Sequence, residues 1–186
     1  MRASGSETPN LTGQLLVAHP NLRDPNFRKT VLFLSAHDSE QGAHGLVLNR
    51  PMNKNLTDFL PDHELDALGE IPVYLGGPVG GHELTIVSFN WVAGEVKITF
   101  HSQLSLDQVQ TLAGTGSKLI RAFVGYAGWA GGQLESELQQ SAWIVQPATE
   151  SILGDATNGQ IWLELMKNLG PAYHLLAIAP DDPSLN

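Results

Sequence analysis

The chain has 186 residues and a mass of 20.1 kDa, with 42% apolar and 16% charged residues, which fits one domain. It contains no cysteine, which excludes disulfides, thiolate metal sites and cysteine nucleophiles. Nineteen acidic and ten basic residues give a formal net charge of −9, and the basic residues are scattered, which disfavours direct nucleic-acid binding unless folding gathers distant bases.

The first ten residues, MRASGSETPN, lack the apolar core of a secretory signal and predict a disordered tail. We therefore expect residues 11–186 to form the single domain. The longest apolar runs, such as residues 15–18 and 31–34, are far too short to span a bilayer. These features predict a cytoplasmic protein without a membrane partner.

Short apolar runs bounded by turn residues predict a series of strands along the chain. These strands cover residues 14–18, 31–35, 45–48, 73–75, 84–88, 96–100, 120–126, 143–145 and 175–179. Gly94, between Val92 and Val96, is typical of a hairpin turn because apolar β-branched residues flank it.

Capping and stop signals predict four short helices, over residues 55–60, 105–113, 132–140 and 158–169. Ser105 and Gln108 form a capping box at the start of the second helix. Asn158 caps the last helix, and Gly170 and Pro171 stop it. Because helices and strands alternate without a steady rhythm, the order favours an α+β fold over a doubly wound sheet.

The motifs of the common enzyme classes are incomplete. Residues 114–118 resemble a phosphate-binding loop but lack its earlier glycine and the Ser or Thr after Lys118. No serine lies in a G-x-S-x-G motif, and no two histidines have the spacing of metal ligands. Glu135 and Glu137 point to different sides of their helix. We therefore predict no catalytic residue, no metal and no cofactor.

Three glycine-rich segments, residues 42–51, 76–81 and 125–135, predict a ligand site. Asn49 and Arg50 follow a buried strand, where their side chains can hold a loop or a ligand. Gly76 and Gly77 permit close backbone approach. In the third segment a strand leads through glycines to a helix start, whose N–H groups can accept an anion beside a flat aromatic wall.

The candidate ligand-binding residues are Asn49, Arg50, Gly76, Gly77, Tyr126, Gly128, Trp129, Gln133 and Glu135. The alternative is purely structural: glycines allow segments to cross closely, and aromatic rings fill the core beside them. In that case the guanidinium of Arg50 would pair with an internal acid such as Glu135.

Several further motifs accompany these segments: Gly13 to Ala18, Pro20, Asp24 to Phe27, Thr30-Val31, His37, Glu137-Leu138 and Trp143. In this combination the chain resembles the YqgE/AlgH family over nearly its whole length after the tail. Small departures are His44, where the family often has Met, and the pair Ala130-Gly131. The resemblance implies a bacterial cytosolic protein whose strongly bent, mostly antiparallel, barrel-like sheet is surrounded by short helices.

The family has no agreed catalytic residue, and its name reflects a proposed part in transcriptional regulation. Three functions are therefore open. The first, which we favour, is a regulatory protein that is not an enzyme and that binds a small anionic ligand or a partner protein. The second is a DNA-binding transcriptional regulator. The third is a small-molecule hydrolase in which His37 acts as a base with a nearby acid, although the adjacent Asp38 would point elsewhere.

Overall fold

The computed structural model describes residues 9–61, 66–92, 95–101, 103–113, 118–155 and 159–179. The strands in these ranges are β1 (Gln14–Ala18), β2 (Val31–Asp38), β3 (Gly42–Val47), β4 (Pro51–Asn55), β5 (Pro72–Leu75), β6 (Val79–Val92), β7 (Glu95–His101), β8 (Lys118–Trp129) and β9 (Trp143–Pro147). The helices are α1 (Leu56–Phe59), the 3-10 helix η1 (Asp66–Glu70), α2 (Leu106–Ala113), α3 (Gln133–Gln139), α4 (Glu150–Asp155), α5 (Ile161–Leu169) and α6 (Pro171–Ile178).

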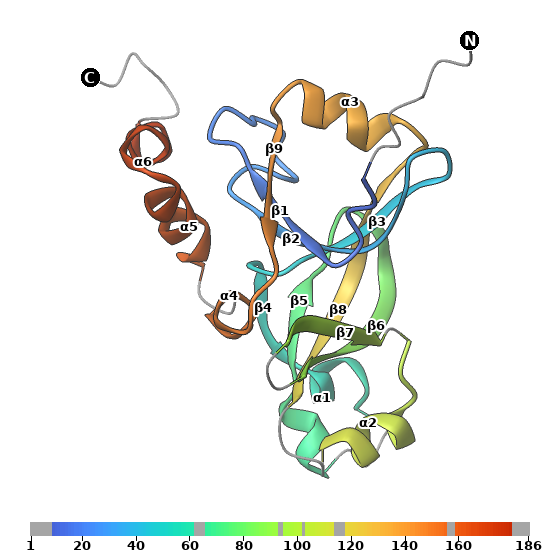
Figure 1. Cartoon of the computed structure of the whole chain (residues 1–186). Coiled ribbons are helices and arrows are strands. Elements are labelled where there is room, and N and C mark those ends of the chain that lie inside the picture. The colour runs from blue at the N-terminus through green and yellow to red at the C-terminus, as the bar shows by residue number, and fades with distance from the viewer. Residues whose placement is uncertain are drawn as a thin grey trace.

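All nine strands belong to one bent sheet, shown with its surrounding helices in Figure 1. The order is β4-β5-β8-β3-β2-β1-β9, and β6 pairs with both β8 and β7. Among the described residues only the β5–β8 pair is parallel. The α+β fold with a mostly antiparallel sheet is therefore confirmed, and the sheet is open, because β4 and β9 lie at its two ends.

Strand β8 is shared by two halves of the sheet. Residues Ala122 to Val124 pair with β5, whereas Ala127 to Trp129 pair with β3. Figure 1 shows β1, β2, β3 and β9 beside α3 in one half, and β4 to β7 with α1 and α2 in the other. Since one strand changes its neighbour partway along its length, the sheet bends where the change occurs.

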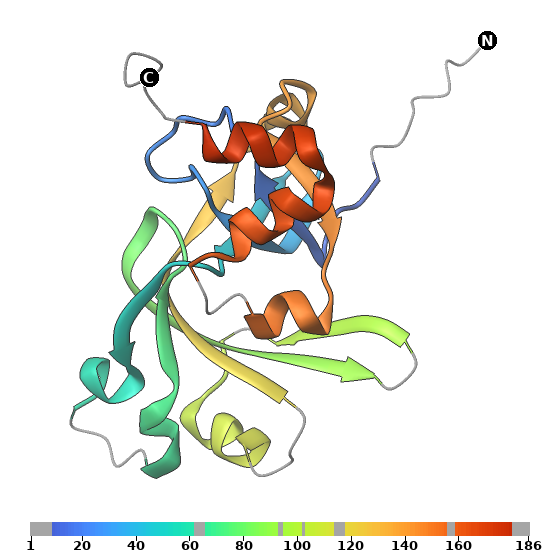
Figure 2. The ribbon, with the colours of Figure 1, turned by 90° about the vertical axis from the view of Figure 1, so that its left-hand side faces the viewer.

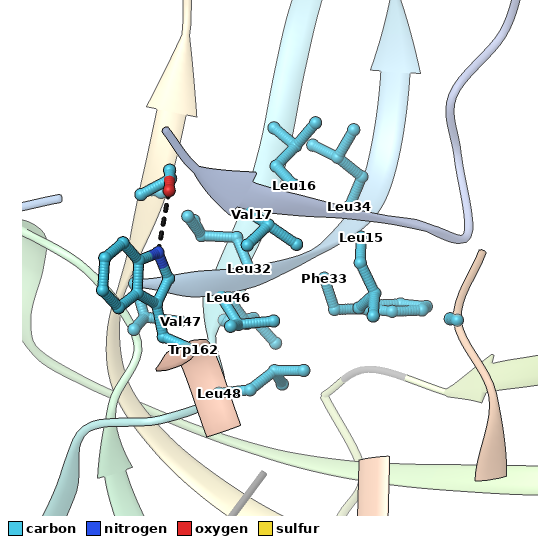
Figure 3. Close-up of a cluster of buried hydrophobic side chains, with 14 of the residues drawn as sticks. Leu15, Leu16, Val17, Leu32, Phe33, Leu34, Leu46, Val47, Leu48 and Trp162 are labelled. Atoms are coloured by element: carbon cyan, nitrogen blue, oxygen red, sulfur yellow. Dashed lines mark hydrogen bonds between the residues drawn. The ribbon is translucent and has the colours of Figure 1, made fainter. Parts of the chain in front are cut away.

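The larger core is centred on the first half, where β1 is buried along nearly its whole length, and it extends to Tyr74 of β5 and Phe89 of β6. Such a strand needs cover on both faces, which explains why it is a continuous apolar run. Trp162 of α5 packs into this core and donates its indole N–H to the Ala18 carbonyl at 2.7 Å (Figure 3). A smaller core around Leu56, Val73 and Ile86 fills the second half.

One charged side chain of this sheet is buried in the interior of the protein. Arg121 of β8 is fully buried, and its guanidinium carbon lies 5.0 Å from the centre of the Tyr74 ring. It donates a hydrogen bond to the Leu153 carbonyl, which ties α4 to the sheet. Burial lowers the pKa of Arg121, and the interaction with Tyr74 opposes that shift.

One predicted strand is wrong. Residues 175–179 form the second half of α6 and its C-cap, although a short apolar run bounded by turn residues favours a strand. The stop signal at Gly170 and Pro171 does end α5, but Pro171 also begins α6, because a proline at the first helical position loses no hydrogen bond. The short elements β4, η1 and α4 were not predicted.

The other predicted elements that fall on described residues are present; β1 has its predicted ends, and the ends of the others are shifted. Ser105 and Gln108 form the predicted capping box, with hydrogen bonds of 2.9 and 3.3 Å. The strand predicted over 84–88 is part of the longer β6. Residues 1–8, Gly94, residues 114–117 and Asn158 lie outside the described residues. None of the helices in the described ranges is long and apolar enough to cross a membrane.

Candidate functional site

Asn49 and Arg50, just after β3, hold the loop that joins β1 to β2. The Asn49 amide accepts the Val31 N–H and donates to the Lys29 carbonyl, both at 2.9 Å. The Arg50 guanidinium donates to the Pro25 carbonyl at 3.3 Å. Burial lowers the pKa of Arg50, the nearby Arg28 lowers it further, and Asp24 raises it. The sequence left open whether Asn49 and Arg50 hold a loop or a ligand, and the contacts described here are to a loop. The described contact of the Arg50 guanidinium is with Pro25 and not with Glu135.

The loop over residues 19–30, called here the basic loop, also has its own hydrogen bonds. The Asp24 carboxylate accepts the Asn26 N–H at 2.7 Å, and the Asp24 carbonyl accepts the N–H groups of Phe27 and Arg28. Lys29 has a φ of 57°, in the left-handed region that a residue with a side chain seldom adopts. Such strained backbone persists where its surroundings fix it, and it is common at ligand sites.

The basic loop and the end of α6 enclose a hollow of about 310 Å³, called here the basic hollow. Figure 2 shows the loop, in blue, beside the end of α6. Its lining includes Pro20, Leu22, Arg23, Arg28, Lys29 and Leu176. With Arg50 behind the loop, four of the ten basic residues of the chain gather here. The three basic lining residues were not among the predicted candidates, and the adjacent pair Arg28-Lys29 was their one signal in the sequence.

Gly76 and Gly77 lie beside the part of β8 where its pairing partner changes from β5 to β3. The Gly76 N–H donates to the Val124 carbonyl and the Gly76 carbonyl accepts the Val47 N–H, both at 2.8 Å. A Cβ on Gly76 would lie 2.2 Å from the Gly125 carbonyl oxygen, and one on Gly77 would lie 2.2 Å from the Tyr126 backbone. These two glycines therefore pack directly against β8, and their described surroundings explain them without a ligand.

Tyr126 lies beside a different hollow, of about 290 Å³. Its lining includes Ser35, His44, Glu83, Thr85, Gln103 and Tyr126. The Tyr126 ring stacks on His44, with ring centres 4.6 Å apart, and His44 Nδ1 lies 2.6 Å from the Ser35 hydroxyl. Gly128 is exposed, and a Cβ there would lie 3.4 Å from the Tyr126 ring.

This second hollow is a poor site for an anion. Glu83 supplies a negative charge, and neither lysine nor arginine lines it. Burial lowers the pKa of His44 more than Glu83 raises it, which favours the neutral ring.

The side chains of Trp129 and Gln133 both contact Glu137, and Trp129 also lines a further hollow of about 440 Å³ together with His37 and His44. One Glu137 oxygen accepts the indole N–H groups of Trp129 and Trp143, at 2.9 and 2.7 Å. The other accepts the Gln133 amide N–H at 2.9 Å. Phe27 of the basic loop stacks on Trp129, with ring centres 6.2 Å apart. The cluster therefore fixes α3, β8, β9 and the basic loop relative to one another.

Glu135 pairs with His37 across 98 residues of sequence. The Glu135 carboxylate lies 2.8 Å from His37 Nε2, and His37 Nδ1 accepts the Leu11 N–H at 3.0 Å. Because a backbone N–H only donates, Nδ1 carries the lone pair and the Nε2–H donates to Glu135. His37, with a side chain only 2% exposed, has no free lone pair for a substrate proton in this arrangement.

The predicted candidates thus fall into separate groups. Asn49 and Arg50 support the basic loop, and Gly76 and Gly77 pack against β8. Tyr126 borders the second hollow, and Gly128 lies beside the Tyr126 ring. Trp129 and Gln133 contact Glu137, and Glu135 contacts His37. In the described part of the chain, no three His, Asp or Glu side chains gather as metal ligands would. Of the hollows described here, the basic hollow is the one suited to an anion.

Comparisons with known proteins agree on a family. A family model described as AlgH-like matches residues 15–174. A relative from Streptomyces avermitilis, named UPF0301 protein, is 35% identical over 196 residues, which cover 97% of this chain and 98% of the relative. A second UPF0301 protein, from Streptomyces coelicolor, is 37% identical over 199 residues and covers the same shares.

Two solved structures are also similar. The solution structure of the AlgH protein from Pseudomonas aeruginosa has a TM-score of 0.66 and 34% identity, covering 98% of this chain and 100% of that one. A crystal structure of a protein from Corynebacterium diphtheriae has a TM-score of 0.69 and covers 95% of this chain and 96% of its own; at 20% identity it supports the fold alone. From the matched family model and the close relatives along nearly its full length, we conclude that the chain belongs to the AlgH-like family.

Proposed function

We propose that this chain is a non-catalytic regulatory protein that receives a small anionic ligand in the basic hollow. The observation that carries the proposal is the convergence of Arg23, Arg28 and Lys29 on one hollow in a chain with a net charge of −9. Guanidinium and ammonium groups that line a concave surface favour phosphate or carboxylate, and arginine adds a planar fork that binds either group with two hydrogen bonds.

The size and the construction of the hollow support this function. Its volume of about 310 Å³ is at the lower end of the range of small-molecule sites. Asn49 and Arg50 hold the basic loop from behind, so the loop is ordered before a ligand arrives. A site that is ordered in advance loses less conformational entropy on binding.

The arrangement of His37 gives less support to a hydrolase. A histidine base needs a free ring nitrogen within reach of the substrate. Here one nitrogen of His37 accepts a backbone N–H and the other donates to Glu135. We therefore place binding ahead of hydrolysis at His37.

Calorimetric titration with inorganic pyrophosphate tests the anion site. We expect the wild-type protein to bind pyrophosphate, and Arg23→Gln or Arg28→Gln to weaken binding by roughly tenfold each, since each removes a charge-assisted hydrogen bond. Lys54→Gln is the matched control, because it removes the same charge from an exposed lysine that lies over Phe59 instead. It should leave the affinity unchanged.

Two results would contradict the anion site. One is the absence of pyrophosphate binding at low salt by the folded wild-type protein. The other is an equal loss of affinity in Lys54→Gln and Arg28→Gln, because a general effect of net charge would then explain the binding without the hollow.

Duplex DNA provides a separate test of the regulatory mode. We expect no binding at physiological salt by fluorescence anisotropy, because specific DNA binders present a broad basic face, and here the gathered charges surround one small hollow. Saturable DNA binding whose affinity falls steeply with salt would instead show phosphate-backbone contacts and a DNA-binding regulator.

A further inference from the structure

Exposed apolar side chains concentrate on α5 and α6. Among the residues whose side chains the structure describes, six large apolar side chains are exposed, and four of them belong to this helix pair. On α6 the exposed fractions are 65% for Leu175, 46% for Leu176 and 55% for Ile178; Leu163 of α5 is 37% exposed. Isolated exposed leucines need no explanation, but several on one short helix indicate a contact surface.

This apolar surface is continuous with the basic hollow. Leu176 and Ala179, at the end of α6, line the hollow together with Arg23 and Arg28. Pro20 and Leu22 add apolar lining from the basic loop. Figure 2 shows α6 on the outside of the molecule, with the basic loop beside its end. Cationic groups therefore lie in the hollow, and aliphatic groups extend from its edge along the helix.

A ligand that fits both parts has an anionic head and an aliphatic tail. We propose that the basic hollow and α6 bind an amphiphilic anion, a phosphate or carboxylate that carries an alkyl or acyl chain. The head lies between Arg28, Lys29 and Arg23. The tail leaves the hollow over Leu176 and then covers Leu175 and Ile178, which lie three residues apart on one side of α6. This inference rests on the anion site proposed above and adds the chemistry of the rest of the ligand.

Charge complementarity favours this occupant over a second copy of the chain. Two copies that meet through α6 would bring together two identical basic hollows, and each copy has a net charge of −9. Both the local and the overall charges would then repel. An anionic head is attracted to the basic lining residues, while its tail removes the leucine and isoleucine side chains from water.

A series of monomeric alkyl phosphates (methyl, butyl, hexyl and octyl phosphate, all below micelle-forming concentrations) tests the tail. We expect the affinity to rise about twofold for each added methylene, about half of the gain for a fully buried methylene, because the helix surface covers one side of the chain. The rise should stop once the chain extends beyond the exposed part of α6.

Variants separate the two parts of the site. Leu175→Gln and Ile178→Gln should flatten the dependence on chain length, while the affinity for methyl phosphate stays unchanged, because neither side chain lines the basic hollow. Leu75→Gln changes a side chain of the same type that is 36% exposed on β5 and serves as the matched control. It should keep the full dependence on chain length.

The outcomes distinguish the two proposals. If methyl phosphate and pyrophosphate both fail to bind, the anion site is wrong and this inference falls with it. If they bind but octyl phosphate binds no more tightly, the anion site stands and the amphiphile is wrong. The same holds if Leu75→Gln and Ile178→Gln behave alike.

Vesicles identify the source of the amphiphile. Vesicles of phosphatidylcholine with phosphatidic acid present the same phosphate head in a bilayer. Binding to these vesicles that Ile178→Gln abolishes supports the amphiphile and assigns it to a lipid surface. Binding of octyl phosphate without vesicle binding supports it and assigns it to a free acyl or alkyl anion.

Discussion

Replacing Gly76 with alanine is expected to lower the free energy of unfolding by about 3 kcal/mol, in the range found for severe overpacking. The new Cβ would lie 2.2 Å from the Gly125 carbonyl oxygen, and that neighbour is backbone, which cannot rotate away. Gly76 is also held from two sides, by Val124 and Val47. Relief of the clash must therefore lengthen hydrogen bonds in both halves of the sheet. Urea denaturation followed by circular dichroism measures the loss.

Gly81→Ala is the control for this prediction. Gly81 lies in the same glycine-rich segment, but a Cβ there would meet no atom within 4 Å, and its φ is not in the left-handed region. Its free energy of unfolding should change by about 0.5 kcal/mol or less. If Gly76→Ala unfolded at the wild-type urea concentration, the close packing of Gly76 against β8 would be refuted.

The second large effect is expected for Glu137→Leu, at about 3 kcal/mol of lost stability. The Glu137 carboxylate accepts the indole N–H groups of Trp129 and Trp143, whose residues are 6% and 4% exposed. Leucine fills a similar volume but leaves both donors buried without an acceptor, at about 1–3 kcal/mol for each. Denaturation followed by tryptophan fluorescence measures the loss.

Glu137→Gln distinguishes the hydrogen bonds from the packing. Glutamine keeps one oxygen that accepts both indole N–H groups, so it should recover most of the stability lost in the leucine variant. Glu164→Leu makes the same change at an exposed position of α5 and should alter the stability by only about 0.5 kcal/mol. Equal losses in the leucine and glutamine variants would show that the acceptor oxygen is not what Trp129 and Trp143 require.

Much of the fold could be predicted because local signals and tertiary structure agree. A buried strand such as β1 appears in the sequence as a continuous apolar run, and the box of Ser105 and Gln108 marks the start of α2. The error at α6 has a physical origin. An exposed helix usually has a polar face, whereas α6 exposes Leu175, Leu176 and Ile178, so its sequence has the composition of a buried strand.

The candidate site was harder to predict because its residues depend on long-range contacts. His37 and Glu135 are 98 positions apart, and no spacing rule connects them. Asn49 and Arg50 were correctly placed at a strand end, but whether they would hold a loop or a ligand depended on where the basic loop folds. Arg23 and Lys29 meet at one hollow because that loop curves against α6, a helix that the sequence did not reveal.

The sharing of β8 has a consequence for how the molecule can change. Neither half of the sheet keeps its hydrogen-bonding partners if the chain is divided, because β3 and β5 pair with successive parts of the same strand. Recombination that joins the first half of one homologue to the second half of another must therefore match both sets of neighbours along β8. For the same reason, a substitution that distorts β8 in one half of the sheet also disturbs the strand pairing in the other half.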